Sequence, residues 1–257
     1  MIKKTDVNSI AWEKLFQSWM LFWPNTLRRF YDSVFHPPLF ILEDILRASK
    51  YINHFPQQLC PLKDRPKFSS QFITPATCLH VYPALQNKQV KRFAALGTAH
   101  CARYENGNWK LPYRLQDFHM TELVVVGGEK QVDDERNKVK KIVEKIFADL
   151  RLKGTFNNAT DAFFLGQSRG AKVIQQLKGL KQEFIVKDDK TSIALASVNN
   201  HEDFFGKCFN IKSGNVFASS FCVAFGIERF ATYSLKVWGE NPQNWPKFFK
   251  KYGRISQ

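Results

Sequence analysis

The stretch from residue 101 to residue 128, CARYENGNWKLPYRLQDFHMTELVVVGG, constrains the fold of this chain more than any other. A turn-rich Asn-Gly-Asn segment at 106–108 follows a short run at 102–105. The chain then returns through 113–118 and continues into a β-branched run at 122–126, which ends at two glycines. This pattern predicts a β-hairpin.

One face of the predicted hairpin gathers side chains that suit a nucleotide. Arg103 and Glu105 are two residues apart and therefore share a face of a strand, as do Arg114, Gln116 and Phe118. Arginine binds phosphate through two parallel hydrogen bonds, and an aromatic ring offers a base a stacking surface. The competing interpretation is a surface hairpin with cross-strand ion pairs.

The charge of the chain favours an anionic partner. Its 257 residues are enough to bury a full core in one or two domains, and 44% hydrophobic with 24% charged residues is typical of a soluble globular protein. A net charge of +15 suits a nucleotide, a nucleic acid, an acidic protein or a membrane surface, and charge alone does not choose among them.

The cysteines indicate a reducing compartment, so we expect a cytoplasmic protein. An odd and sparse set argues against a disulfide framework, and the absence of a C-x-x-C pair argues against a classical zinc finger. A metal site built from dispersed residues stays open. The five cysteines are Cys60, Cys78, Cys101, Cys208 and Cys222.

The first 70 residues are expected to form an aromatic-rich helical segment and a proline-rich linker, ahead of a second domain at 71–257. Prolines at 24 and 37–38 are expected to break the helical pattern. The apolar run near the N-terminus is too short and too interrupted by charge to span a bilayer. A membrane-surface helix is one interpretation, and a helix packed on the body or on a second subunit is favoured. Its aromatic residues at helical spacing are Trp12, Phe16, Trp19, Phe22 and Trp23.

Beyond residue 71, predicted strands are interleaved with helices, and neighbouring strands are joined as hairpins rather than through regular βαβ units. This order predicts an α+β fold with an antiparallel sheet flanked by helices. Acidic residues at 133–135 are expected to open a helix that ends at Gly154, and a second helix is expected over 225–237. Further strands are expected at 77–82, 90–95, 156–165, 183–186, 191–198 and 215–223.

Two further groups of residues carry possible chemistry. Gly226 would let a ligand approach the backbone closely, and Arg229 in the following helix could then reach a phosphate, although pairing with an acid is an alternative. Cys78, Glu122 and Cys222 lie on separate segments, and two thiolates with one carboxylate can bind zinc while leaving one position open. A lone cysteine is usually a small buried residue, and spacing alone does not select these over the other cysteines.

The order of these motifs resembles motifs 2 and 3 of the class II aminoacyl-tRNA synthetases. Over residues 72–235 the chain resembles the amino acid:carrier protein ligases, which are relatives of the catalytic domain of the zinc-dependent archaeal seryl-tRNA synthetases. Six stretches in the same order carry this resemblance: TPATCLHVYP, CARYE with RLQDFHMTELVVVG, ATDAFF, LKQEFIV, SVNNHEDFFGKCFNI and SSFCVAFGIERF.

The resemblance implies a site residue by residue. Cys78, Glu122 and Cys222 are then zinc ligands. Arg103 contacts the α-phosphate of ATP, Glu105 lies near the adenine or the amine, Phe118 stacks on adenine, Arg114 aids the phosphates and Arg229 holds the γ-phosphate; Arg103, Glu105 and Arg229 are the catalytic group. Asp161, Asn199 and His201 fall near the amino-acid pocket. Thr121, Ala162 and Asn200 depart from the family pattern, which leaves the identity of the amino acid open.

The implied activity is a ligase reaction that uses ATP with Mg²⁺ and zinc. A small amino acid such as glycine or alanine would be activated as an aminoacyl-adenylate and transferred to the phosphopantetheine thiol of a carrier protein, by a homodimer with no tRNA or membrane partner. One alternative is an enzyme that charges tRNA. Another is a non-catalytic paralogue that binds nucleotide or RNA.

Overall fold

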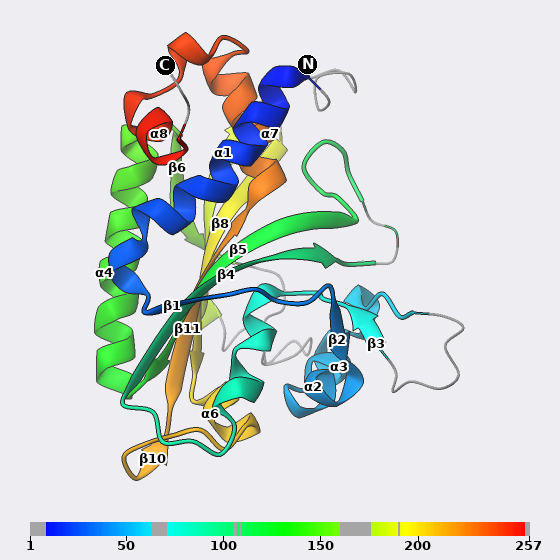
Figure 1. Ribbon diagram of the computed structural model, residues 1–257, viewed down its shortest axis with the longest axis vertical. Helices are drawn as coiled ribbons and strands as arrows, with labels where there is room; N and C mark the ends of the chain where they lie inside the picture. The colour runs from blue at the N-terminus through cyan, green and yellow to red at the C-terminus, as the bar shows by residue number, and fades with distance from the viewer. Residues whose placement is uncertain are drawn as a thin grey trace.

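The computed structural model of the protein describes residues 9–62, 71–104, 107, 109–159, 176–189 and 191–254. Its centre is a seven-stranded sheet in the order β1-β4-β5-β11-β8-β7-β6, in which β1 is parallel to β4 and the other neighbours are antiparallel (Figure 1). These strands are β1 (Ser33–Phe35), β4 (Arg92–Ala102), β5 (Asp117–Gly127), β6 (Gly154–Asn158), β7 (Lys181–Asp188), β8 (Thr191–Glu202) and β11 (Ser219–Gly226). The predicted α+β class, with an antiparallel sheet flanked by helices, is confirmed.

Helices and two small hairpins complete the described structure. The hairpins pair β2 (Phe40–Leu42) with β3 (Gln71–Ile73), and β9 (Lys212–Ser213) with β10 (Val216–Phe217). The α-helices are α1 (Ile10–Thr26), α2 (Glu43–Ala48), α3 (Tyr51–His54), α4 (Glu129–Asp149), α6 (Phe204–Cys208), α7 (Ile227–Trp238) and α8 (Lys247–Tyr252). The 3₁₀ turns are η2 (Arg28–Phe30), η3 (Pro56–Gln58), η4 (Thr77–His80), η5 (Tyr82–Leu85) and η7 (Pro242–Asn244). Within this part of the chain, no helix combines the length and the apolar composition needed to cross a bilayer.

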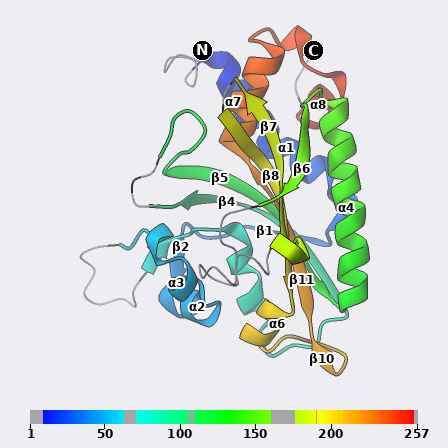
Figure 2. The ribbon, with the colours of Figure 1, turned by 180° about the vertical axis from the view of Figure 1, so that it is seen from behind.

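The sheet separates two hydrophobic clusters because alternate residues of a strand point to opposite faces. On β11, Phe221 and Val223 join a cluster with α1, α4, α7 and α8, whereas Cys222 joins a second cluster with η4, η5 and α6. Figures 1 and 2 show α4 along one side of the sheet and α2 and α3 on the other. The predicted metal ligands therefore lie on the face opposite α4.

Helix α1 is packed on the body of the protein, which was the favoured interpretation of its aromatic residues. Ser9 caps the helix by accepting a hydrogen bond from the Trp12 backbone N–H at 3.1 Å. Trp19 and Trp23 are fully buried, and the indole N–H of Trp19 donates to Ser234 of α7 at 3.2 Å. The division predicted at residue 70 stays a prediction. Residues of α1 belong to the same hydrophobic cluster as residues of α4 and α7.

The expected break at Pro24 is wrong, because α1 continues through this residue to Thr26. Proline fixes φ near the helical value, and the backbone hydrogen bond that it removes falls in the last turn, where the disruption is small. The chain then enters η2 and the edge strand β1.

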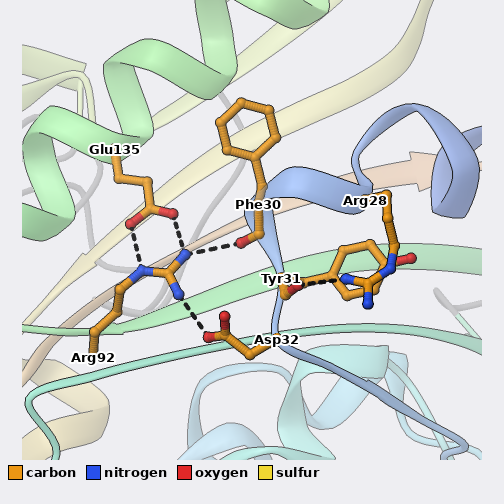
Figure 3. Close-up of polar contacts among 6 residues, drawn as sticks. All are labelled: Arg28, Phe30, Tyr31, Asp32, Arg92 and Glu135. Carbon is orange, nitrogen blue, oxygen red and sulfur yellow. Dashed lines mark hydrogen bonds and ion pairs between the residues drawn. The ribbon is translucent and has the colours of Figure 1, made fainter.

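Arg92, at the start of β4, ties this N-terminal segment to α4 (Figure 3). Its Nε donates to Glu135 of α4 at 3.0 Å, and its Nη2 donates to the Phe30 carbonyl at 3.0 Å. Its Nη1 donates to Asp32 at 2.6 Å. One guanidinium group therefore links α4, η2 and the segment that leads into β1.

Several predicted boundaries differ from the structure. The strand predicted at 77–82 is wrong: this segment forms η4 and η5, because the Val81 N–H turns back to the Cys78 carbonyl at 3.0 Å instead of joining a ladder. The helix predicted from residue 133 begins at Glu129 and ends at Asp149, and its apolar residues face the core. The segment 215–223 divides into β10 and β11, and the helix predicted from residue 225 begins at Ile227. Part of 156–165 lies outside the described residues.

Candidate active site

A single cavity on the face of the sheet opposite α4 collects the predicted site residues. Strands β5, β7, β8 and β11 form its floor, and α3, η3 and η4 contribute to its walls. The predicted residues that line it are Cys78, Arg103, Arg114, Phe118, Glu122, Asn199, His201, Cys222 and Arg229. Glu105 and Asp161 lie outside the described residues. Chain segments far apart in the sequence therefore converge as the motifs predicted.

Cys78, Glu122 and Cys222 form a compact and buried group of donors. One ligand atom from each lies within 4.8 Å of the others, and the residues are 7%, 2% and 2% exposed. Strands β5 and β11 bring Glu122 and Cys222 to the same face of the sheet. Cys222 pairs with Val124, which points to the same face as Glu122 two residues earlier on β5. Turn η4 adds Cys78, whose backbone N–H donates to Glu122 Oε2 at 2.6 Å. The Cys222 thiol donates to Glu122 Oε1 at 3.3 Å.

The electrostatics of this group fit a bound cation. The hydrogen bond with Cys222, together with burial, raises the pKa of the Cys78 thiol well above its ordinary value. Burial also raises the pKa of the Glu122 carboxyl, although the Cys78 N–H opposes that shift. Two sulfurs and a carboxylate in an apolar enclosure are costly to ionise without a compensating positive charge. Sulfur donors select zinc over magnesium or calcium, so the residues fit a zinc site.

Asn199 and His201 of β8 lie directly beside Cys222. The Asn199 amide nitrogen donates to Cys222 Sγ at 3.3 Å, and His201 Nε2 lies 3.6 Å from the same sulfur. Burial lowers the pKa of His201 to about 3, so its imidazole is neutral. The Asn199 carbonyl oxygen is buried and has no hydrogen-bond partner among the residues that the structure describes.

Arg103 and Arg229 of the predicted phosphate site are anchored by backbone carbonyls. Arg103 Nε donates to the Pro75 carbonyl at 2.8 Å, and its guanidinium carbon lies 5.5 Å from the centre of the Phe118 ring. Arg229 Nε donates to the Tyr113 carbonyl at 2.8 Å, and its Nη1 donates to the Ala194 carbonyl at 2.9 Å. These anchors leave side chains of positive charge lining one cavity with an aromatic ring, which suits a nucleotide. The individual roles predicted for them stay predictions.

Glu228, Glu183 and Tyr113 are among the cavity residues that received no role from the sequence. Glu228, at the start of α7, accepts hydrogen bonds from the His119 backbone N–H at 2.8 and 2.9 Å and lies 2.7 Å from His119 Nδ1. Glu183 lies 2.9 Å from Lys181 Nζ, and Tyr113 is held through its hydroxyl by Asp188. The only sequence signal for Glu228 and Glu183 was their position inside stretches that carry the family resemblance.

Known proteins match the chain over most of its length. No family model matches it. It is 31% identical over 180 residues to amino acid–acyl-carrier-protein ligase 1 of Bradyrhizobium diazoefficiens, a match that covers 68% of this chain and 55% of the relative. It is 28% identical over 171 residues to a type-2 serine–tRNA ligase of Methanothrix thermoacetophila, covering 65% of this chain and 34% of the relative. The chain thus spans about half the length of the carrier-protein ligase and about a third of the length of the tRNA ligase.

Solved structures show the same fold. The seryl-tRNA synthetase of M. kandleri, in complex with a tRNA, superposes with a TM-score of 0.80 at 17% identity, covering 94% of this chain and 55% of that chain. The seryl-tRNA synthetase of Pyrococcus horikoshii, complexed with ATP, superposes with a TM-score of 0.75 at 14% identity, covering 96% of this chain and 57% of that chain.

Proposed function

Because the chain is a homologue of the amino acid–acyl-carrier-protein ligases and has the fold of the class II aminoacyl-tRNA synthetases, we propose that it joins a small amino acid to a carrier protein at the expense of ATP. The convergence of three buried donors with three arginines in one cavity is the observation that carries this proposal. The donors could hold a metal ion that binds the amine of the substrate, and the arginines could bind a triphosphate.

The amino-acid end of the cavity lies at Cys78, Glu122 and Cys222. When bound by these residues, zinc would supply an electrophilic position for the free α-amine of the substrate. Asn199 and His201 contact Cys222 at this end of the cavity and η4 supplies Cys78, an arrangement that would suit a small substrate. Lys181 and Glu183 of β7 also line the cavity.

The nucleotide end lies between Arg103, Phe118 and Arg229. A carboxylate oxygen of the amino acid would attack the α-phosphorus of ATP, and the bond from that phosphorus to the bridging oxygen of pyrophosphate would break. Fixed guanidinium groups would stabilise the charge on the phosphates, so that positioning and electrostatics supply most of the rate acceleration. Phe118 would stack on adenine, and Arg114 at the exposed side of the cavity would assist the phosphates.

The transfer step would form a thioester. The phosphopantetheine thiol of the carrier protein loses its proton and attacks the carbonyl carbon of the aminoacyl-adenylate, which forms the C–S bond and expels AMP. The net charge of +15 would favour association with an acidic carrier protein.

An exchange assay tests the first step and a transfer assay tests the second. We expect ATP–pyrophosphate exchange that depends on one of glycine, alanine or serine, and a mass increase of a phosphopantetheinylated carrier protein equal to one aminoacyl group. The matched control is a carrier protein without the phosphopantetheine arm. Charging of tRNA with no transfer to any carrier would instead support the tRNA-charging alternative. A lack of exchange with every small amino acid would refute the proposal.

The exposed apolar residues around the sheet edge support the expected homodimer. Val34 of β1 is 52% exposed, and Leu39, Phe40 and Leu42 follow it at 44%, 39% and 42%. Clustered apolar exposure of this kind is typical of interaction surfaces. We expect the wild-type protein to have twice the chain mass in light scattering and Phe40→Glu to shift it toward the monomer. A monomeric wild type would refute this part of the proposal. We further propose a cytoplasmic location, where reducing conditions would preserve the site thiols.

A further inference from the structure

We infer that His201 and Asn199 act as positioning residues that donate two N–H···S hydrogen bonds to the Cys222 sulfur and thereby set its strength as a zinc ligand. The inference rests on the zinc site of the proposed function. The nitrogen atoms of the two side chains lie 3.6 Å and 3.3 Å from Cys222 Sγ, and all three residues are at most 5% exposed.

The hydrogen-bond network fixes the orientation of both donors. A metal-bound thiolate can only accept hydrogen bonds, so the Asn199 atom that faces it is the amide nitrogen, which also donates to Ser197 Oγ at 3.0 Å. On the far side of the imidazole, Ser220 Oγ lies 3.1 Å and the Tyr82 hydroxyl 3.2 Å from His201 Nδ1. With a hydroxyl donating to Nδ1, the neutral ring carries its proton on Nε2, which faces the sulfur.

The backbone is shaped to present His201 at this point. Phe221 pairs with Asn200 and Ser220 pairs with Glu202, so His201 is an extra residue in β8, and the register shifts there. Such bulges re-aim side chains and are frequent beside functional sites. Glu202 has φ of 50°, an uncommon value for a residue other than glycine, and its N–H donates to the Asn200 side chain at 3.0 Å.

The two sulfur ligands are thus held differently. Cys222 has two nitrogen donors on its sulfur, whereas the Cys78 segment uses its backbone N–H on Glu122. Hydrogen bonds to a thiolate withdraw electron density from it, which leaves the metal more electrophilic toward a substrate amine. The expected consequence is that Cys222 is the weaker electron donor of the two.

Metal binding and spectroscopy test the inference without relying on activity. Zinc affinity is measured by competition with a chromogenic chelator, and the thiolate-to-metal charge-transfer band is measured in the cobalt-substituted protein. For His201→Phe and Asn199→Ala we expect a charge-transfer band at longer wavelength, because the sulfur regains electron density. We also expect zinc binding weaker by about 10- to 100-fold, the range typical of lost outer-shell partners, because the buried thiolate loses donors that stabilise its negative charge.

Two further variants separate the hydrogen bond from general disruption. His201→Gln keeps an N–H donor at the Nε2 position, so its affinity and its band should return close to those of the wild type. His100→Phe is the control, because His100 of β4 lies outside the cavity lining and its Nε2 lies 3.0 Å from Asp117 Oδ2. Its charge-transfer band should be unchanged.

The outcomes distinguish this inference from the proposed function. A wild type that holds zinc and activates an amino acid, with His201→Phe and Asn199→Ala unchanged in affinity and band, would overturn the inference alone. His201→Gln behaving like His201→Phe would also overturn it. So would a cobalt spectrum in which the His201 variants lose a nitrogen ligand, because His201 would then bind the metal directly. A wild type that binds no zinc and shows no exchange would overturn the proposed function itself.

Discussion

Tyr113 links the anchoring of Arg229 to an ion pair near the surface, and Tyr113→Phe tests this link. The Tyr113 carbonyl accepts a hydrogen bond from Arg229 Nε at 2.8 Å, and its hydroxyl donates to Asp188 Oδ2 at 2.5 Å. Lys236 of α7 forms an ion pair with Asp188. Burial raises the pKa of Tyr113 above its ordinary value, so the hydroxyl keeps its proton and acts as the donor.

The magnitude of the effect follows from this geometry. A hydrogen bond to a charged group contributes about 1.5–3 kcal/mol to stability. Because Lys236 would still neutralise Asp188 in the variant, we expect a loss near the lower end, about 1.5 kcal/mol in the free energy of unfolding. The segment that carries the Arg229 anchor would lose its fixed position, so the KM for ATP should rise while the KM for the amino acid stays constant.

Urea unfolding and ATP–pyrophosphate exchange at varied ATP measure the two effects. Tyr233→Phe is the matched control, because its hydroxyl donates to the Lys187 carbonyl over a long 3.4 Å. We expect the control to change stability by less than about 0.5 kcal/mol. Equal stability of Tyr113→Phe and the control, with an unchanged KM for ATP, would refute this reasoning. So would a rise in the KM for the amino acid alone.

Three other predictions concern the metal donors, the aromatic cluster and an acid-sensitive histidine. Cys222→Ala should lose bound zinc and amino-acid activation but keep ATP binding, measured by metal analysis, exchange and nucleotide titration; full activity without metal would contradict it. Trp19→Phe should destabilise the fold by about 1 kcal/mol more than Trp23→Phe in urea unfolding, because the buried Ser234 hydroxyl would lose its hydrogen-bond donor. The buried Trp23 Nε1 has no hydrogen-bond partner in the described part of the chain, so Trp23→Phe breaks no such bond there. Burial lowers the pKa of His80 to about 4 from 6.5, so between these values the unfolded chain binds more protons and stability falls as pH decreases; His80→Gln should flatten that part of an unfolding–pH series, and an equally steep loss would contradict it.

The sequence predicted the convergence of the site better than its local structure. The family motifs placed Arg103, Phe118 and Glu122 in one site, and the cavity contains all three. The segment around Cys78 was expected to be a strand, since it is rich in β-formers. Its turn is fixed by the bond from the Cys78 N–H to Glu122, 44 residues away, and no local pattern reveals such a contact.

Contacts of long range also explain the residues that received no role. The carboxylate of Glu228 meets the His119 N–H across 109 residues of chain, and the Tyr113 hydroxyl meets Asp188 across 75. The register shift at His201 depends on how β8 pairs with β11. Each of these features requires the assembled sheet, so periodicity and spacing in one sequence do not specify it.

The alternation along β11 makes one strand serve two purposes. Phe221 and Val223 are seated among the aromatic rings of the α4 side, and Cys222 between them faces the donors on the other side. A register slip of a single residue would turn Phe221 and Val223 toward the donor face of the sheet and Cys222 toward the hydrophobic core. If the proposed zinc site is filled on folding, uptake of the metal would therefore report that β5 and β11 have reached their native register with η4 in place, and a refolding experiment could use it as a signal for this step.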